Sequence, residues 1–254
     1  MHRFFVAPGD VHRTEQGTPE FVQITGEEAW HLAKVLRLAL GDEVVVGDNT
    51  GMEYRLVLTS VTPNSAQGRV VAAAPSTAEI GLPLTLFQGL PKADKMDYIV
   101  QKCTEMGIAT IRPVETERSV LKLAGAKATE RVARWQRISK EAAKQAGRAV
   151  CPQVAPVSAL ADAVRAAGLP FLLAPWEEAT GSFSAALQAI PGAAKSGGIG
   201  VVIGPEGGLS RAEADMLSAM GGVLVSLGPR ILRTETAGLV TLSALLFAMG
   251  ELGG

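Results

Sequence analysis

The sequence of 254 residues is poor in the residue types that build disulfides, zinc sites and histidine-based catalysis, with two cysteines and three histidines. Cys103 and Cys151 lie far apart and form no Cys-x-x-Cys pair, so we expect neither a disulfide framework nor a metal site, and a reducing compartment is favoured. The chain begins without the apolar core of a signal peptide, and its most hydrophobic stretch, 237–249, is too short to span a bilayer. These absences predict a cytoplasmic protein without a bound metal and without a membrane segment.

The chain also lacks an excess of charge of either sign, since its formal net charge is −1, which argues against a general attraction to nucleic acid or membranes. The exception is the segment 118–148, where nine basic and two acidic residues give a local charge of +7. A helix is expected over 128–146, and a one-signed helix face is typical of contact with a phosphate backbone, although it can also be merely solvated. At about 100° per residue, six cations fall within about 140° of one another: Lys127, Arg131, Arg134, Arg137, Lys144 and Arg148.

Two parts of the chain differ in their predicted pattern of secondary structure. Residues 1–74 show short β-type runs separated by turn signals, with one helix expected from Glu27 to Leu38, which predicts a small β-barrel. Small and turn-forming residues indicate a linker over 75–83. Residues 84–254 alternate strands with helices, which predicts an α/β domain with a mostly parallel sheet covered on both faces. Four polar residues of the first part could gather on one RNA-contacting surface or lie on a solvated face: Arg3, His31, Lys34 and Arg37.

Two glycine-containing loops near the end of the chain each join a hydrophobic run to a helix. The first follows the run 199–203 and reads Gly204-Pro-Glu-Gly-Gly208, after which Ser210 and Glu213 form a capping box. The second follows the run 223–227, and Thr234 is the expected N-cap of the helix after it. Two such units in succession predict neighbouring strands whose loops meet at the carboxyl edge of the sheet, where open α/β sheets bind ligands.

The residues of these loops restrict the chemistry that they can perform. Neither loop has the glycine spacing of a dinucleotide or nucleotide-triphosphate site, and Pro205 and Pro229 remove backbone donors that a phosphate cradle would use. Glu206 would repel a phosphate, so this loop favours a ligand that is not anionic there, or is simply a tight turn. In the second loop Arg233 could hold a phosphate or polarise a carbonyl oxygen, and Glu235 could accept or relay a proton. The alternative is an Arg–Glu ion pair that closes a helix start.

The motifs resemble those of the RsmE family, SPOUT-class methyltransferases that act on a uridine N3 of 16S ribosomal RNA. The two most specific are Ile203-Gly-Pro-Glu-Gly-Gly208 and Leu227-Gly-Pro-Arg-Ile-Leu-Arg-Thr-Glu-Thr-Ala237. Shorter motifs extend the resemblance over nearly the whole chain: Arg3-Phe-Phe-Val6, His31-Leu-Ala-Lys-Val-Leu-Arg37, Lys102-Cys-Thr-Glu-Met-Gly107, Glu117-Arg-Ser119, the stretch from Arg134 to Gln145, and Pro175-Trp-Glu-Glu178.

The resemblance implies a PUA-like RNA-binding barrel over residues 1–74 and a SPOUT methyltransferase domain with a deep trefoil knot over residues 84–254. It implies a homodimer formed through the SPOUT domain, with 16S rRNA of the small ribosomal subunit as the partner. It also implies S-adenosylmethionine as the cofactor, held by three loops. The expected cofactor contacts are Leu173, Ala174, Gly204, Glu206, Gly207, Gly208, Leu227, Gly228, Ile231, Leu232, Thr236 and Ala237.

Catalytic roles follow from the chemistry of uridine N3, which carries a proton at neutral pH. That proton must be removed or the resulting anion stabilised, and we assign Glu235 to the proton relay and Arg233 to the anion. Arg118 and Arg230 join the basic residues named above as expected RNA contacts. A non-catalytic RNA-binding or ribosome-assembly factor is the alternative, although such a protein has no need of intact cofactor loops.

Overall fold

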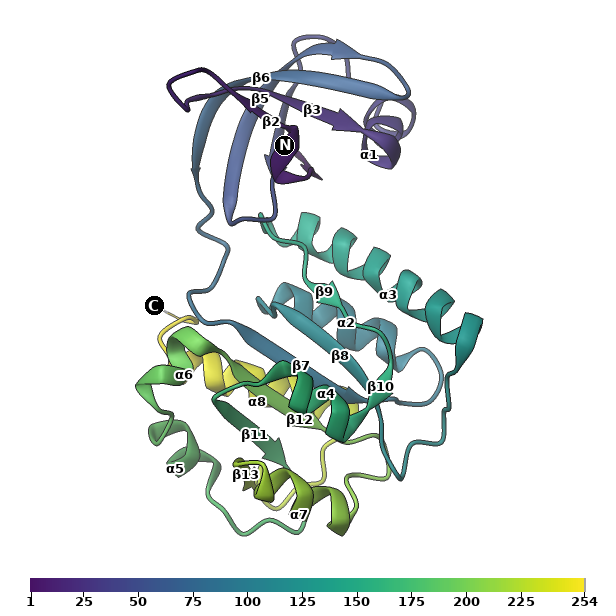
Figure 1. Ribbon diagram of the computed structural model, residues 1–254, viewed down its shortest axis with the longest axis vertical. Helices are drawn as coiled ribbons and strands as arrows, with labels where there is room; N and C mark the ends of the chain where they lie inside the picture. The colour runs from purple at the N-terminus through teal and green to yellow at the C-terminus, as the bar shows by residue number, and fades with distance from the viewer. Residues whose placement is uncertain (254) are drawn as a thin grey trace. The chain divides into compact units, whose positions relative to one another are not determined.

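The computed structural model describes residues 1–253, which form two compact units (Figure 1). Unit 1 comprises Met1–Glu79 together with Ala143–Cys151, and unit 2 comprises Ile80–Ala142 together with the chain from Pro152 onward. These units differ in two respects from the expected domains, residues 1–74 and residues 84–254. A strand of unit 1 continues past residue 74, and a segment from the middle of the chain belongs to unit 1.

Unit 1 is built on a six-stranded sheet with the order β1-β4-β5-β6-β3-β2, in which β1 and β4 are parallel and the other pairs antiparallel. Side chains on alternate positions of these strands are buried, as a strand with one face on a core requires. Tyr54, Leu56 and Leu58 of β5 show this spacing, and none is more than 2% exposed. The strands are β1 (His2–Phe5), β2 (Val11–Arg13), β3 (Pro19–Thr25), β4 (Glu43–Gly47), β5 (Met52–Val61) and β6 (Ser65–Pro75).

The segment Ala143–Cys151 is held in unit 1 by the carboxylate of Glu79. This carboxylate accepts a hydrogen bond from the Arg148 guanidinium at 2.7 Å and from the next two backbone amides at 2.8 and 2.9 Å. The segment approaches β4 so closely that a Cβ at Gly47 would lie 2.5 Å from the carbonyl oxygen of Ala149, a contact that only glycine avoids. The sequence carries no boundary signal for this return, because the segment begins within the last turn of the helix Gly125–Gln145.

The helix expected from Glu27 to Leu38 is shorter and irregular. It consists of α1 (Gly26–Trp30) and a π-helical turn, η2 (His31–Val35). The backbone amide of Leu36 donates to the carbonyl of His31 at 3.0 Å, which is the i→i−5 bond of a π-helix. Arg37 then has a φ of 55°, and this left-handed conformation prevents the helical segment, which ends at Val35, from continuing to Leu38.

Unit 2 contains a seven-stranded sheet with all pairs parallel, which confirms the predicted α/β class. Its order is β10-β8-β7-β12-β11-β13, with β9 paired to β8 outside that path. The strands are β7 (Leu84–Gly89), β8 (Thr110–Glu115), β9 (Gln153–Val154), β10 (Ser158–Ala159), β11 (Phe171–Pro175), β12 (Ile199–Ile203) and β13 (Gly222–Val225). The expectation that β12 and β13 are neighbours was wrong, because β11 lies between them and pairs with both.

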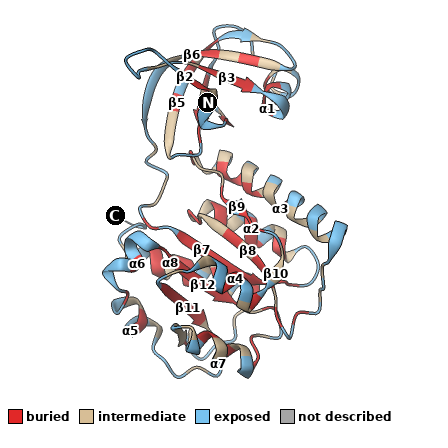
Figure 2. Cartoon of the chain, viewed as in Figure 1, coloured by how far each residue is buried: buried red, intermediate tan, exposed pale blue. Residues whose placement is uncertain are grey.

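Both faces of this sheet are covered, as Figure 2 shows by the buried colour along β7, β11 and β12. Successive residues of β12 belong to the hydrophobic cores on opposite faces of the sheet. Val201 and Ile203 lie in one core, and Val202 lies in the other. Because both faces of such a strand are buried, its sequence is a continuous apolar run. The helices are α2 (Lys95–Glu105), α3 (Gly125–Gln145), α4 (Leu160–Ala167), α5 (Phe183–Gln188), α6 (Gly192–Gly197), α7 (Arg211–Ala219) and α8 (Thr234–Ala248).

The order of the strands positions the candidate site. β11, β12 and β13 run in parallel, so the loops that follow them lie at one edge of the sheet. β7 is the other neighbour of β12, which brings the start of α2 to the same edge. The trefoil knot implied by the family resemblance stays a prediction.

Candidate functional site

Three loops at the carboxyl ends of β11, β12 and β13 line two adjoining cavities. The first has a volume of about 440 Å³ and is lined by Pro175–Glu177, Ser226–Leu232 and Ala237. The second has a volume of about 460 Å³ and is lined chiefly by Gly204–Leu209 and Ile231–Thr234. Because both cavities share residues of the first and third loops, they form a single candidate site. The residues common to both are Pro175, Glu177, Ile231, Leu232 and Ala237.

The loop after β12, Gly204–Leu209, is held by hydrogen bonds from residues of other elements. The Glu206 carboxylate accepts a hydrogen bond from the backbone amide of Lys92 at 3.1 Å, and the carbonyl of Gly207 accepts one from the Arg118 guanidinium at 2.9 Å. Gly208 has a φ of +69°, and a Cβ there would lie 2.5 Å from Oε1 of Glu177. The predicted capping box at the start of α7 is confirmed, since Ser210 and Glu213 exchange both hydrogen bonds.

Thr234 has a different role from the predicted N-cap of α8. Arg233 occupies the N-cap position and Thr234 is the first helical residue. The Thr234 hydroxyl donates to the carbonyl of Gly204 at 2.6 Å and accepts from Nε2 of Gln88 at 2.9 Å. The hydroxyl therefore joins the glycine loop to α8 and β7.

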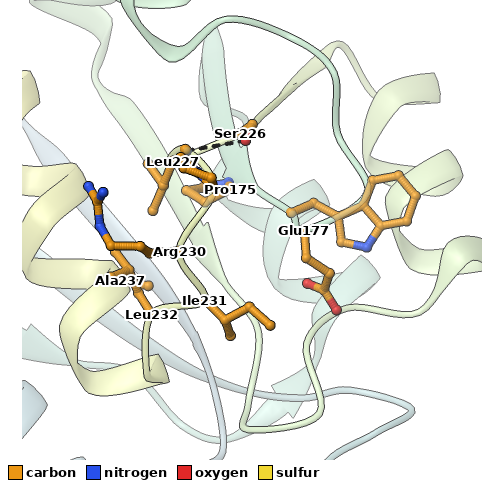
Figure 3. Close-up of a pocket in the computed structure, with 11 residues that line it drawn as sticks. Pro175, Glu177, Ser226, Leu227, Arg230, Ile231, Leu232 and Ala237 are labelled. Atoms are coloured by element: carbon orange, nitrogen blue, oxygen red, sulfur yellow. Dashed lines mark hydrogen bonds between the residues drawn. The ribbon is translucent and has the colours of Figure 1, made fainter.

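The loop after β13, Ser226–Arg233, has few internal contacts. Gly228 N–H donates to the Ser226 hydroxyl at 3.2 Å, and Ile231 is 94% exposed although it lines both cavities. Among the described residues 1–253, Arg230 and Arg233 have no ion-pair partner. Figure 3 shows the guanidinium of Arg230 and the carboxylate of Glu177 at opposite sides of the first cavity. This loop thus presents an apolar side chain and two unpaired cations.

A lysine that sequence reasoning missed lines the second cavity. Nζ of Lys95, in the first turn of α2, is 2.9 Å from Oε1 of Glu206 and 3.3 Å from Oε2 of Glu235. The hydrogen bond to Glu206 and the second carboxylate raise the pKa of Lys95. Partial burial would raise the pKa of Glu206, but hydrogen bonds from Lys95 and from the backbone amides of Glu206 and Lys92 outweigh it and lower that pKa. Both shifts favour the ionised forms of Lys95 and Glu206, so the cavity wall carries this ion pair.

The structure places most of the expected cofactor contacts on the cavity walls. Gly204, Glu206, Gly207, Gly208, Leu227, Gly228, Ile231, Leu232 and Ala237 line one or both cavities. Leu173 and Ala174 do not, because both are fully buried within β11, and Thr236 is an exposed residue of α8 outside the lining. Of the two expected catalytic residues, Arg233 lines the second cavity. Glu235 is not a lining residue, but its carboxylate contacts Lys95, which is one.

The expected RNA contacts of unit 2 are engaged to different degrees. Arg134 pairs with Asp97, and Arg131 lies 3.8 Å from Asp94. Arg137 is exposed, with a hydrogen bond only to the backbone of its own helix. Arg118 is bound to the glycine loop, as described above. An anionic partner could still bind this surface of α3, but it would have to compete with the carboxylates of Asp94 and Asp97 for the arginines.

Three expected RNA contacts of unit 1 are unsuited to that role. Nζ of Lys144 is 3.1 Å from Glu28 with its side chain 12% exposed, and the side chain of Arg148 is 3% exposed against Glu79. Arg3 pairs with Glu53 and is 15% exposed. Helical periodicity placed Lys144 and Arg148 on the charged face because it cannot show where a helix ends and the chain enters another core. Lys34 and Arg37 are exposed and His31 is half-buried, so their role in RNA contact stays a prediction.

Sequence reasoning missed Lys95 and Ser226 as lining residues. A usable signal existed for Lys95, since it follows a strand of the parallel sheet by six residues and such loops meet at one edge. What was missing was the strand order, which makes β7 the neighbour of β12.

Several other site classes find no support in the described residues 1–253. No group of three or more His, Cys, Asp or Glu side chains in that range is arranged to hold a metal ion. No helix in it combines the length and apolar character needed to cross a membrane. Burial raises the pKa of the Cys103 thiol to about 12, which makes it a poor nucleophile.

Comparison with known families decides the affiliation of the chain. Residues 78–246 match the RNA methyltransferase domain family, and residues 24–71 match the RNA methyltransferase PUA domain family. The ribosomal RNA small subunit methyltransferase E of Bacillus subtilis is 35% identical over 100% of this chain and 99% of its own length. The chain belongs to the ribosomal RNA small subunit methyltransferase E family. A family member from Synechocystis is 34% identical over 95% of this chain and 76% of its own length.

Solved structures of family members and related methyltransferases have the same fold. The ribosomal RNA small subunit methyltransferase E from Neisseria gonorrhoeae, bound to S-adenosyl methionine, superimposes with a TM-score of 0.80 at 30% identity, covering 97% of each chain. A methyltransferase from Legionella pneumophila in complex with the cofactor SAM gives 0.81 at 28% identity, again covering 97% of each chain. The similarity therefore extends over both units of the chain.

Proposed function

We propose that the protein is an S-adenosylmethionine-dependent methyltransferase that methylates N3 of a uridine in 16S rRNA of the small ribosomal subunit. The observation that carries the proposal is the cavity formed by the loops after β11, β12 and β13 in a chain of this family. The same families and the PUA match of unit 1 support RNA as the substrate. The uridine N3 target rests on the sequence motifs that resemble the RsmE family.

The residues on the cavity walls fit S-adenosylmethionine chemically. This cofactor carries a sulfonium and an ammonium group, and the walls supply the carboxylates of Glu177 and Glu206. Its adenosyl part requires apolar contact and backbone polar groups, which Leu227, Ile231 and Leu232 and the glycine-containing loops provide. The absence of a phosphate cradle agrees with a ligand that has no phosphate.

The chemistry divides among few side chains. When bound, the cofactor supplies the methyl group from its sulfonium and leaves as a neutral thioether, while N3 gains the methyl and gives up its proton. We assign the N3 proton to the carboxylate of Glu235, which is 20% exposed and contacts Lys95 on the cavity wall. Arg233, with no carboxylate partner among the described residues, is assigned to the negative charge on the uracil oxygens. Alignment of the methyl group with N3 supplies much of the remaining acceleration.

The proposal extends to the assembly and the compartment. We propose a homodimer formed through unit 2, because Val240 and Phe247 of α8 are 39% and 70% exposed and present apolar surface to a partner. We also propose a cytoplasmic location, where the small ribosomal subunit is assembled.

The competing function is a non-catalytic RNA-binding factor with the same fold. Isothermal titration with S-adenosylmethionine separates the two, because only the methyltransferase needs a cofactor. A saturable heat with one site per chain is expected. No detectable heat from well-folded protein would favour the binding factor.

The RNA side of the proposal is tested on α3. Reversal of Arg131, Arg134 and Arg137 to glutamate is expected to weaken binding of small-subunit RNA and to flatten its dependence on salt, because fewer counterions are released. Reversal of Arg165, which pairs with Asp162 on α4 and was assigned no role, serves as the control. An unaltered salt slope in the triple variant would show that the face is only solvated.

A further inference from the structure

The site contains a charged group to which the proposed reaction assigns no role. Lys95 projects from the first turn of α2 into the lining of the second cavity, and its side chain is 26% exposed. Its ammonium touches two carboxylates from two other elements, Glu206 of the glycine loop and Glu235 of α8.

The two carboxylates depend on this lysine unequally. Glu206 is also fixed by the backbone amide of Lys92. The rest of its loop is fixed by Arg118 and by the hydroxyl of Thr234. Oε2 of Glu235 is buried, and among residues 1–253 it has no hydrogen-bond partner apart from the Lys95 ion pair. Loss of Lys95 would therefore leave the glycine loop in place and release Glu235.

We propose that Lys95 is a positioning residue for methyl transfer, which holds the carboxylate of Glu235 toward the cavity wall by bridging it to Glu206. This inference rests on the proposed function, because it gives Lys95 a role through the assigned proton acceptor.

The charged groups that face Lys95 come from several elements. Arg233, on the loop before α8, and Glu177, on the loop after β11, line the same cavity. Asp97, on its own helix, is occupied by Arg134 and by the indole N–H of Trp135 at 3.1 Å. The remaining cation of the lining, Arg233, has no carboxylate partner in the described part of the chain, so it does not substitute for Lys95 in the bridge.

The test uses Lys95→Met, which keeps an unbranched side chain one atom shorter than lysine and removes its charge. The single-turnover methylation rate is expected to fall about ten- to a hundredfold, the size of effect that a misplaced catalytic group produces. The dissociation constant for S-adenosylmethionine, measured by titration calorimetry, is expected to change less than about threefold, because the glycine loop keeps its other contacts. Lys95→Arg is expected to recover at least part of the rate. Lys102→Met is the matched control, since Lys102 lies on the same helix and, within residues 1–253, forms its ion pair with Glu105 alone.

A second readout does not need the loaded enzyme. The carbon-13 chemical shift of the Glu235 carboxyl in the cofactor-free protein, measured by NMR at one pH, is expected to change in Lys95→Met and to stay unchanged in Lys102→Met. Lys95→Arg is expected to bring this chemical shift back toward that of the parent.

The outcomes separate the inference from the proposed function. A parent protein that methylates no RNA overturns the proposed function. An active parent with an equally active Lys95→Met variant overturns the role of Lys95. Equal losses of rate and cofactor affinity, or a Glu235 carboxyl signal that does not move in Lys95→Met, would mean that Lys95 only supports the loop, and this too overturns the inference.

Discussion

The two glycine-containing loops of the site have opposite character. The loop Gly204–Leu209 is tied to three other elements through Glu206, Gly207 and the carbonyl of Gly204. The loop Ser226–Arg233 carries an almost fully exposed isoleucine and two arginines that have no ion-pair partner in the described chain. Both loops line the same cavities. One wall of the site is therefore fixed before a ligand arrives, and the other has side chains whose contacts remain to be made.

The difference indicates a division of labour. Fixed backbone and fixed charges lower the cost of binding, because little has to be ordered when the cofactor enters. Unpaired arginines and an exposed apolar side chain gain their contacts only with ligand or RNA in place. Substitutions in the fixed loop should therefore affect folding and cofactor affinity together, whereas substitutions in the open loop should affect ligand-dependent steps alone.

The largest effect is expected from Arg233→Ala in the open loop. Methyl transfer should fall about a hundred- to a thousandfold, the usual consequence of removing a charge-stabilising donor. Stability and S-adenosylmethionine affinity should stay close to those of the parent, because Arg233 forms no ion pair. Single-turnover methylation of small-subunit RNA measures the rate, and calorimetry measures the affinity. Full activity would move the search for anion stabilisation to Arg230 or to the RNA.

Gly208→Val should damage the fixed loop through its backbone. Valine at a φ of +69° costs roughly 1–3 kcal/mol in strain, and its Cβ would collide with the carboxylate of Glu177 at 2.5 Å. Cofactor affinity should fall roughly tenfold or more, with a lower unfolding midpoint. Gly192→Val, at a glycine where a Cβ meets nothing within 4 Å, is the comparison. Normal cofactor binding by Gly208→Val would place the binding site elsewhere.

Ile231→Ser should separate binding from stability. The side chain is 94% exposed in the absence of ligand, so its loss should leave the free energy of unfolding unchanged. If ligand covers it, the lost burial is worth up to about 1.5–3 kcal/mol, and we expect cofactor affinity to fall roughly tenfold. Chemical denaturation and calorimetry give the two quantities. A fall in stability without a change in affinity would contradict the open character of this loop.

The smallest effect is expected from Ser210→Ala, at the end of the fixed loop. Loss of the cap of α7 should cost about 1 kcal/mol of stability, seen as a lower denaturant midpoint. Cofactor affinity should be largely retained, because the Glu206, Gly207 and Gly204 contacts do not involve this hydroxyl. Loss of binding in this variant would show that the cap, and not those contacts, fixes the loop.

Much of the fold could be predicted because it depends on local patterns. The runs that became β7, β11 and β12, and the capping box at Ser210, follow from spacing and residue type. The order of strands could not, because the placement of β11 between β12 and β13 depends on which apolar faces pack in three dimensions. The return of the segment around Arg148 to unit 1 depends on one carboxylate, Glu79, about seventy residues earlier.

The prediction of the site was limited in the same way, because local patterns do not show which distant residues come into contact. Loop residues such as Gly204 and Leu232 were predicted from motifs and line the cavities. Arg148 was expected at the RNA surface and is buried, because periodicity reports the face of a helix and not its partner. Lys95 was missed for the converse reason, since its importance comes from Glu206 and Glu235, which lie more than a hundred residues away in the sequence.

The central claim is that this chain places a methyl group on uridine N3 of small-subunit ribosomal RNA. Its most direct test is incubation of unmethylated small ribosomal subunits with the protein and methyl-labelled S-adenosylmethionine, followed by mass spectrometry of the nucleosides. Label is expected in N3-methyluridine at one position, present with the parent protein and strongly reduced with Arg233→Ala. Label in another nucleoside, or no label from protein that binds the cofactor, would contradict the claim.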